Sequence, residues 1–353
     1  MRYLLRFGRV LAILCLIAIS TALVLAGGEQ PKLVIADNDF NGPPNTLSNL
    51  RAALMFLESP EVRVLGFTVV TGDGWRDEEV AHTLKLLEIA GPPDIPVVPG
   101  AIFPLVNTQV ETELWERTFG SLGYKGAWGP PPASRSPDEI PILPEGMPTI
   151  QPADDIAAIF MIKQVHAHPH EVSIFAGGPL TNLALAVRLD PDFPRLIKEL
   201  VFEGAFLQLG YPDFNTRFDP EAAHIILTAP WTSITAVADV VSSALADKIL
   251  SADNVARIQA AKSPIGDYVI RYSHVDINSK WPLWDEVAAA VLIDPLVVLE
   301  SEDDYLDVNL DHGMDYGRAH VWDDKSVPRM NKRKVRVITK IDVDRFKKGS
   351  SNA

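Results

Sequence analysis

The sequence is almost free of cysteine. Its 353 residues contain one, Cys15, and this residue lies within an apolar segment at the N-terminus. A disulfide needs two thiols, so the chain cannot form an internal one. If the N-terminal segment is removed, no thiol is left, which excludes thiol chemistry as the source of an activity.

The sequence also lacks an excess of basic residues. Lys and Arg total 32 against 46 Asp and Glu, and the formal net charge is −14. An acidic surface repels the phosphates of nucleic acid and the anionic headgroups of membranes, so we predict neither as a partner. A cation fits this charge better. With 47% hydrophobic and 22% charged residues, the composition is that of a globular protein.

A long hydrophobic run occupies the N-terminus. Residues 1–26 combine Arg2, Arg6 and Arg9 with an apolar stretch that ends in small residues. This pattern predicts a signal peptide cleaved after Ala26 and a periplasmic or secreted protein. Cleavage would leave 29 basic residues against 46 acidic ones, a net charge of −17. The alternative is an uncleaved anchor, because the run from Val10 is just long enough to span a bilayer.

Past this segment, short apolar runs alternate with helical patterns. The first five stretches are KLVIAD, TLSNLRAALMFLE, VRVLGFTVV, DEEVAHTLKLLEIAG and IPVV, which predict strand, helix, strand, helix and strand. The strand candidates lack polar alternation, as expected of strands covered on both faces. We predict an α/β fold, an open and mostly parallel sheet with helices on both faces. A single large domain is expected over residues 31–346, with a flexible tail at 347–353.

Proline is concentrated between the two halves of this pattern. The stretch WGPPPASRSPDEIPILPEGMP, residues 128–148, contains seven prolines. It predicts a long surface loop, either a lid or an insertion, rather than a domain linker. Near the end of the chain, KVRVITKIDV alternates as a strand does.

Acidic residues follow several of the predicted strands. Asp37 and Asp39 leave the strand LVIA, Asp73 follows TVV, and a third strand in VSIFAGGPLTN leads to Thr181. The carboxyl ends of parallel strands meet at one edge of a sheet, where ligands bind. Carboxylates gathered there repel one another unless a cation or a substrate hydroxyl lies between them. Oxygen ligands of this kind predict calcium or magnesium.

The chain from about Leu33 to Phe346 resembles nucleoside hydrolases of the inosine-uridine type. The resemblance rests on five blocks in order, PEVRVLGFTVVTGDG, LLEIAGPPDIPVVPGAIFPL, GGPLTNLALAVRLDP, DFNTRFDPEAAHI and PLWDEVAAAVLIDP. It implies cleavage of the N-glycosidic bond of ribonucleosides with one calcium ion (Ca²⁺) and a water. It further implies a small-molecule nucleoside as the partner, salvage of nucleosides as the role, and a homo-oligomer, dimer or tetramer.

The resemblance also implies roles for the acidic residues at the strand ends. Asp39 would bind the metal and act as the general base that deprotonates a calcium-bound water, supported by Asp37. The main-chain oxygen of Thr181 and the carboxylate of Asp285 would bind the calcium ion. Such a base is chemically coherent, because a metal lowers the pKa of bound water.

Other positions would contact the substrate. By resemblance, Asn215 and Asp73 would hold the ribose, and Asp213 stands where a Glu is usual. Trp284 stands where broad-specificity enzymes have a His, and both Trp284 and Asp73 match the purine-preferring branch. There, two tryptophans sandwich the purine, and Trp115 lies about where the second is expected. Stacking can raise the basicity of a purine and help it leave.

The opening motif departs from the family. The usual D-x-D-P-G-x-D-D is replaced by DNDFNGPPNTLSNL. Counting back from Pro60 through the helix places Ser48 and Asn49 at the last two Asp positions, whereas counting forward from Asp39 reaches Pro43 and Pro44. We favour Asn49 as a metal ligand, because a loop absorbs an insertion more easily than a packed helix. An amide offers one neutral oxygen, so metal affinity should fall.

The altered motif leaves other functions open. The chain could be a nucleoside- or sugar-binding protein that has lost turnover, or a hydrolase of a different N-glycoside. A phosphotransferase built on D-x-D is the weakest alternative, because no downstream Lys and acidic pair completes such a site.

Four further features predict structure rather than chemistry. Asp219 and Pro220 predict a helix N-cap with Pro in the first position. His82 and His224 have no metal-ligand partners at suitable spacing and are predicted to be structural or solvated. The acidic run Asp303, Asp304, Asp307 and Asp311 predicts a solvated surface rather than a second metal site.

Overall fold

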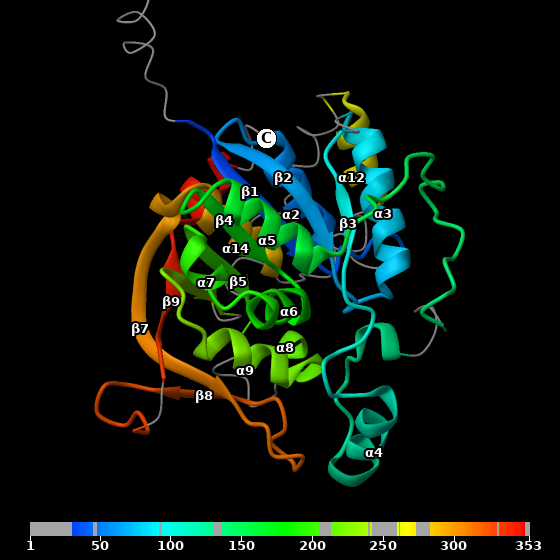
Figure 1. The fold of residues 1–353 in the computed structure, drawn as a ribbon. Helices are drawn as coiled ribbons and strands as arrows, with labels where there is room; N and C mark the ends of the chain where they lie inside the picture. The colour runs from blue at the N-terminus through cyan, green and yellow to red at the C-terminus, as the bar shows by residue number, and fades with distance from the viewer. Residues whose placement is uncertain are drawn as a thin grey trace, which may run out of the picture. The chain divides into compact units, whose positions relative to one another are not determined.

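The centre of the fold is a nine-stranded sheet with the order β3-β2-β1-β4-β5-β6-β9-β7-β8 (Figure 1). Its strands are β1 Lys32–Asn38, β2 Val62–Val69, β3 Val97–Pro99, β4 Val172–Ala176, β5 Glu199–Glu203, β6 Ile234–Val237, β7 Val298–Val308, β8 Ala319–Trp322 and β9 Lys334–Ile341. Strands β1 to β6 and β9 pair in parallel, and β7 is antiparallel to β8 and β9. The predicted open, mostly parallel sheet is confirmed.

The computed structural model describes residues 30–44, 48–91, 94–129, 136–204, 213–238, 241, 260, 262–272, 283–329 and 332–349. The chain from Lys32 onward forms one compact unit. No helix in the described ranges is long and apolar enough to span a membrane. The predicted signal segment, residues 1–26, lies outside the described residues.

Helices cover both faces of the sheet, as predicted (Figure 1). One face carries α2 Ser48–Glu58, α3 Arg76–Ala90, α12 Pro264–Tyr272, α14 Trp284–Ile293 and α15 Val343–Gly349. The other carries α5 Ala157–Ala167, α6 Thr181–Leu189, α7 Phe193–Leu196 and α9 Pro220–Thr228. The remaining helices are α4 Gln109–Phe119 and α8 Phe214–Phe218, with 3-10 turns at Gly126–Trp128 and Pro295–Val297. Because α15 reaches Gly349, the first three residues of the predicted tail are helical.

Each central strand contributes to two hydrophobic cores. On β1, Val34 and Ala36 pack into the core that contains Val287 of α14, whereas Ile35 packs into the core that contains Leu183 of α6. Successive side chains of a strand point to opposite faces, so a strand covered on both faces needs apolar residues at every position. This explains why the strand sequences lack polar alternation.

The carboxyl ends of β1, β2 and β4 lie side by side. Asp37 on β1 is in register with Thr68 on β2 and with Ala176 on β4. Asp39 follows β1 directly, and Asp73 lies in the turn after β2. The polar residues after these strands therefore start from the same edge of the sheet.

Apart from Trp128, which ends a 3-10 turn, the described part of the proline-rich stretch contains no helix or strand, and it is attached to α3 by contacts within it and just past its end. Between 136 and 150, Thr149 donates from Oγ1 to Glu88 at 2.6 Å, and the main-chain N–H of Ile150 donates to the same carboxylate at 3.0 Å. Further back, Glu145 pairs with His82, and both side chains are buried. His82 is therefore structural, one of the two predicted roles.

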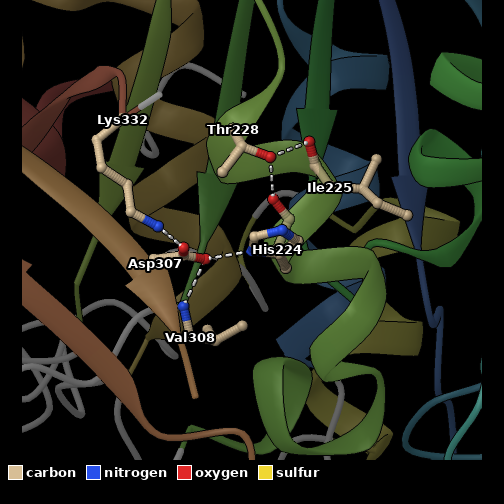
Figure 2. Close-up of polar contacts among 6 residues, drawn as sticks. All are labelled: His224, Ile225, Thr228, Asp307, Val308 and Lys332. Atoms are coloured by element: carbon tan, nitrogen blue, oxygen red, sulfur yellow. Dashed lines mark hydrogen bonds and ion pairs between the residues drawn. The ribbon is translucent and has the colours of Figure 1, made fainter. Parts of the chain in front are cut away.

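A polar cluster joins α9 to β7 (Figure 2). His224 Nδ1 lies 2.7 Å from Asp307 Oδ1, Lys332 pairs with the other carboxylate oxygen, and Val308 N donates to Oδ1 at 2.9 Å. The prediction that Asp307 is solvated is wrong, since the residue is only 5% exposed. It is buried because α9 packs on this end of β7. His224 is structural.

Candidate active site

Asp37 lies at the end of β1 and is almost completely buried. Its Oδ1 accepts hydrogen bonds from Thr68 Oγ1 at 2.6 Å and from Asn182 Nδ2 at 2.8 Å. Burial raises the pKa of Asp37 to about 7, although both hydrogen bonds act to lower it. Asp37 is therefore held in one orientation by two neighbouring elements, β2 and α6.

Asp39 is buried two residues further on and is held by three hydrogen bonds. Asn49 Nδ2 donates to its Oδ1 at 2.8 Å and to its main-chain oxygen at 2.6 Å, and Asp73 N donates to its Oδ2 at 2.8 Å. Burial raises the pKa of Asp39 well above its ordinary value, and the charges of Asp73 and Asp285 raise it further. The carboxyl is thus fixed in place and binds its proton more tightly than an exposed Asp.

Asn38 links this strand end to α14. Its side chain accepts from Asp39 N at 3.0 Å and donates from Nδ2 to Asp285 Oδ2 at 2.8 Å. Asp285 is buried in the first turn of α14, and burial raises its pKa well above the ordinary value. Asn38 therefore links Asp39 and Asp285 at one site, although the two acidic residues are far apart in the chain.

Asn49, in the first turn of α2, hydrogen-bonds to Asp39, and its role as a metal ligand stays a prediction. Pro43 and Pro44, which the count forward from Asp39 reaches, lie in a turn before the helix. The amide nitrogen of Asn49, rather than its oxygen, faces the Asp39 carboxylate. Ser48 begins α2, and its side chain lies outside the described part of the structure.

The end of β4 brings Thr181 to the same edge as the first residue of α6. Its Oγ1 donates to Asp219 Oδ2 at 2.7 Å, and Leu105 N donates to the same oxygen at 2.9 Å. Asp219 Oδ1 accepts from Ala222 N at 3.0 Å and caps α9, with Pro220 in the first turn. The N-cap prediction for Asp219 is confirmed.

The residues predicted to hold the ribose are divided between two elements. Asp73 accepts a hydrogen bond from Tyr124 Oη at 2.8 Å, and burial raises its pKa to about 6. Asn215 on α8 donates from Nδ2 to Gly177 O at 2.7 Å and to Glu203 at 3.0 Å. Asn215 is therefore fixed against the ends of β4 and β5.

Asp213 lies two residues before Asn215 and caps α8. Its Oδ2 accepts from Thr216 N at 2.9 Å, and the side chain is buried.

The two predicted base-stacking tryptophans lie in different surroundings. Trp284 begins α14, directly before Asp285. Trp115 lies on α4, where its indole N–H donates to Gly313 O at 2.8 Å and the guanidinium of Arg217 lies 5.2 Å from its ring centre. The structure thus places Trp284 directly before Asp285 at the start of α14 and joins Trp115 to the turn around Gly313. Their contact with a base stays a prediction.

Several residues of this site were not predicted. Glu79 in α3 is fully buried, and its Oε1 accepts from Gly74 N at 2.6 Å. Among the described residues its Oε2 has no hydrogen-bond partner, and burial together with the charges of Asp39 and Asp73 raises the pKa of Glu79 well above its ordinary value. The other residues missed by the sequence are Asn38, Thr68, Tyr124 and Asn182. Their positions in the sequence could have indicated two of these residues. Asn182 directly follows the predicted Thr181, and Asn38 lies between the predicted Asp37 and Asp39.

The donors at this site match a hard cation in chemistry. Three carboxyls, Asp37, Asp39 and Asp285, are buried at one sheet edge with raised pKa values, so a positive charge would offset their repulsion. Oxygen is the ligand atom that calcium prefers. In the described ranges, no three His, Cys, Asp or Glu side chains are grouped as a metal site by themselves. Amide and main-chain oxygens would therefore have to contribute.

Known proteins resemble this chain over most of its length. A family model described as inosine-uridine preferring nucleoside hydrolase matches residues 34–348. The chain is 29% identical over 280 residues to a probable uridine nucleosidase 2 of Arabidopsis thaliana, covering 78% of each protein. It is 30% identical over 260 residues to a pyrimidine-specific ribonucleoside hydrolase, RihA, of Citrobacter koseri, covering 69% of this chain and 75% of that one. A solved inosine-guanosine nucleoside hydrolase is 25% identical with a TM-score of 0.70, covering 91% of this chain and 98% of that one.

Proposed function

The chain belongs to the inosine-uridine preferring nucleoside hydrolase family, and we propose that it hydrolyses the N-glycosidic bond of ribonucleosides to a free base and ribose. The observation that carries the proposal is the Asp39 carboxyl, buried at the end of β1 and oriented by Asn49 and Asp73. A base of this kind has to be fixed within reach of one water, and these hydrogen bonds fix it.

Asp39 is the general base in this proposal. Its carboxylate takes a proton from the water that attacks C1′ of the ribose, while the bond between C1′ and the nucleobase nitrogen breaks and the sugar gains oxocarbenium character. The electron pair of that bond leaves with the nucleobase, which takes up a proton from solvent. A general base has to be deprotonated at the operating pH; burial raises the pKa of Asp39, and a cation bound beside it would oppose that rise by favouring the carboxylate. Asp37, held by Thr68 and Asn182, supports the strand end that carries Asp39.

Calcium is the cofactor we propose. The residues that would hold it are Asp37, Asp39, Asn49, Asp285 and the main-chain oxygen of Thr181. When bound, the ion would supply a lowered pKa for water and offset the repulsion among the carboxylates. The donor chemistry and the raised pKa values of the acidic groups support this choice.

In this proposal, different residues bind the ribose and the nucleobase of the substrate. Asp73 and Asn215 hold the ribose in this proposal, with Asp213 capping the helix of Asn215. Trp284 faces the nucleobase and favours a purine, because an indole stacks well on a two-ring base. The names of the Arabidopsis and Citrobacter relatives favour a pyrimidine instead, so the choice of base is the variable to measure.

The experiment is a substrate panel. The purified chain without residues 1–26 is incubated with inosine, guanosine, adenosine, uridine and cytidine, and free ribose is measured as reducing sugar with calcium and after chelation. Release that depends on calcium is expected, fastest with a purine. A chain that binds nucleosides by calorimetry but releases no ribose would overturn the hydrolase and leave a binding protein.

The cellular setting is part of the proposal. Residues 1–26 would export the chain to the periplasm or the medium, where it would salvage nucleosides as a dimer or tetramer. The acidic composition supports a small-molecule substrate rather than a nucleic acid.

A further inference from the structure

We propose that Tyr124 is a positioning residue for Asp73 and so sets how tightly the site holds ribose hydroxyls. The inference rests on the proposed function, because it assumes that Asp73 binds the sugar. It goes beyond that function by assigning specificity to a residue that no sequence motif identified.

The carboxylate of Asp73 is held from two sides. Tyr124 Oη donates to its Oδ1 at 2.8 Å, and the side chain of Asn49 also hydrogen-bonds to it. Its main-chain N–H donates to Asp39 Oδ2 at 2.8 Å. Backbone and side chain of Asp73 are therefore both fixed relative to the proposed general base.

The segment that carries Tyr124 is itself anchored to the turn of Asp73. Ala127 N donates to Gly72 O at 2.9 Å, and Gly126 has a φ of 51°. A Cβ at Gly126 would lie 2.1 Å from Gly72 O, so only glycine allows this approach. On the other side, Lys125 forms an ion pair of 2.6 Å with Glu116 of α4. The main chain that carries the Tyr124 phenol is therefore held in a fixed position.

The Tyr124 ring is placed to border the substrate. It packs edge-on against Phe214, with 5.0 Å between ring centres, and Phe214 directly precedes the proposed ribose ligand Asn215. Tyr124 remains 53% exposed, so its ring is accessible. Tyr124 therefore hydrogen-bonds to Asp73, the proposed ribose ligand. The indole N–H of Trp115, by contrast, donates to Gly313 O.

The chemistry of this contact explains a role in sugar recognition. A carboxylate accepts several hydrogen bonds, and a phenol on one oxygen fixes the direction of the remaining lone pairs. Ribose hydroxyls then donate to lone pairs that already point correctly, so less conformational entropy is lost on binding. Without the phenol, Asp73 can turn and its grip on the hydroxyls weakens.

The test is Tyr124→Phe, which removes the hydroxyl and keeps the ring. The matched control is Tyr305→Phe, since Tyr305 Oη donates to Asp324 at 3.1 Å on the exposed part of β7. KM and kcat are measured with the best ribonucleoside of the panel and with its 2′-deoxy and 3′-deoxy analogues. For Tyr124→Phe we expect KM for the ribonucleoside to rise roughly tenfold, the range of a hydrogen bond to a charged group, with a smaller change in kcat.

The deoxy analogues separate positioning from a merely structural effect. Tyr124→Phe should lose most of its preference for ribose over the analogue whose missing hydroxyl Asp73 would bind, and Tyr305→Phe should keep the wild-type preference. An unchanged KM, or an equal loss with all three substrates, would overturn the role of Tyr124.

Failure of the proposed function would be recognised separately. If the wild-type chain turns over no nucleoside, the same comparison is made as Kd by calorimetry with inosine and its deoxy analogues. A ribose preference that Tyr124→Phe removes would support the positioning role in a binding protein. If wild type binds none of these ligands, both proposals are overturned.

Discussion

At the scale of single residues, Asn49 shows how the site manages its charge. A carboxylate beside Asp39 would add repulsion among buried acids, whereas the amide nitrogen of Asn49 donates to Asp39 and removes part of the desolvation cost. The same amide hydrogen-bonds to Asp73. To serve as a calcium ligand, Asn49 has to turn its amide oxygen toward the ion. Its amide nitrogen would then no longer donate hydrogen bonds to Asp39.

We therefore expect Asn49→Asp to bind calcium more tightly. A second charged oxygen ligand should raise the affinity roughly tenfold or more, and without calcium the added repulsion should destabilise the fold by about 1–2 kcal/mol. Calorimetric titration with calcium and thermal unfolding with and without chelator measure both effects, independently of turnover. Asn309→Asp, outside the site, controls for the added charge. Equal calcium affinity in wild type and Asn49→Asp would contradict this account.

The same scale shows what sequence reasoning can reach. Asp37, Asp39 and Asp73 were predicted to converge because each follows a strand of a parallel sheet. Thr68, Tyr124 and Asn182 were not, because their hydrogen bonds join residues 31, 51 and 145 positions apart. Such pairings depend on strand order and on loop paths, which local sequence patterns do not encode.

At the scale of elements, the cluster on α9 and β7 couples a helix near the site to the antiparallel end of the sheet (Figure 2). Burial alone would raise the pKa of Asp307, but hydrogen bonds from His224, Lys332 and Val308 N bring it below its ordinary value. The N-cap of α9 is Asp219, which also contacts Thr181 at the candidate site. The cluster therefore helps to hold α9, which starts from the candidate site.

Replacing Asp307 by Asn should destabilise the protein by about 2 kcal/mol near neutral pH, because it breaks a largely buried ion pair. A carboxyl with a lowered folded pKa adds stability above its unfolded pKa of about 4 and loses it as pH falls through the folded value. The difference in the free energy of unfolding between wild type and Asp307→Asn should thus shrink in acid.

Urea unfolding at neutral pH and at acidic pH values that keep the fold intact measures this difference. The control is Asp324→Asn, since Asp324 pairs with Lys334 at the surface, and its loss should stay within about 0.5 kcal/mol. If Asp307→Asn loses as little free energy of unfolding as Asp324→Asn does, or loses more in acid than at neutral pH, the cluster adds no such stability.

Elements were predicted best where local pattern and tertiary position agree. The alternation of apolar runs and helical patterns indicated β1 to β3 with α2 and α3, and the stretch KVRVITKIDV indicated β9. The place of β9 between β6 and β7 was not predicted, since it depends on pairing between distant segments. Asp307 was assigned to the surface because an acidic run resembles a solvated strand, although α9 covers that part of β7.

At the scale of the whole molecule, the acidic chain buries several carboxyls at one edge of its sheet. Asp37, Asp39 and Asp285 all have raised pKa values, mainly because burial penalises their charged forms. A fold that needed only stability would replace such groups with apolar residues. Family membership and this cost together make the sheet edge the centre of the proposed activity.

The most direct test of this account is the rate of ribose release by Asp39→Asn, compared with wild type at saturating nucleoside. Asn keeps the size of Asp39 and can still accept one of the two hydrogen bonds made to its carboxylate, but it cannot take a proton from water. We expect kcat to fall at least about a hundredfold while the nucleoside still binds, with Asp324→Asn unchanged. If Asp39→Asn releases ribose at the wild-type rate, Asp39 is not the general base and the mechanism is wrong.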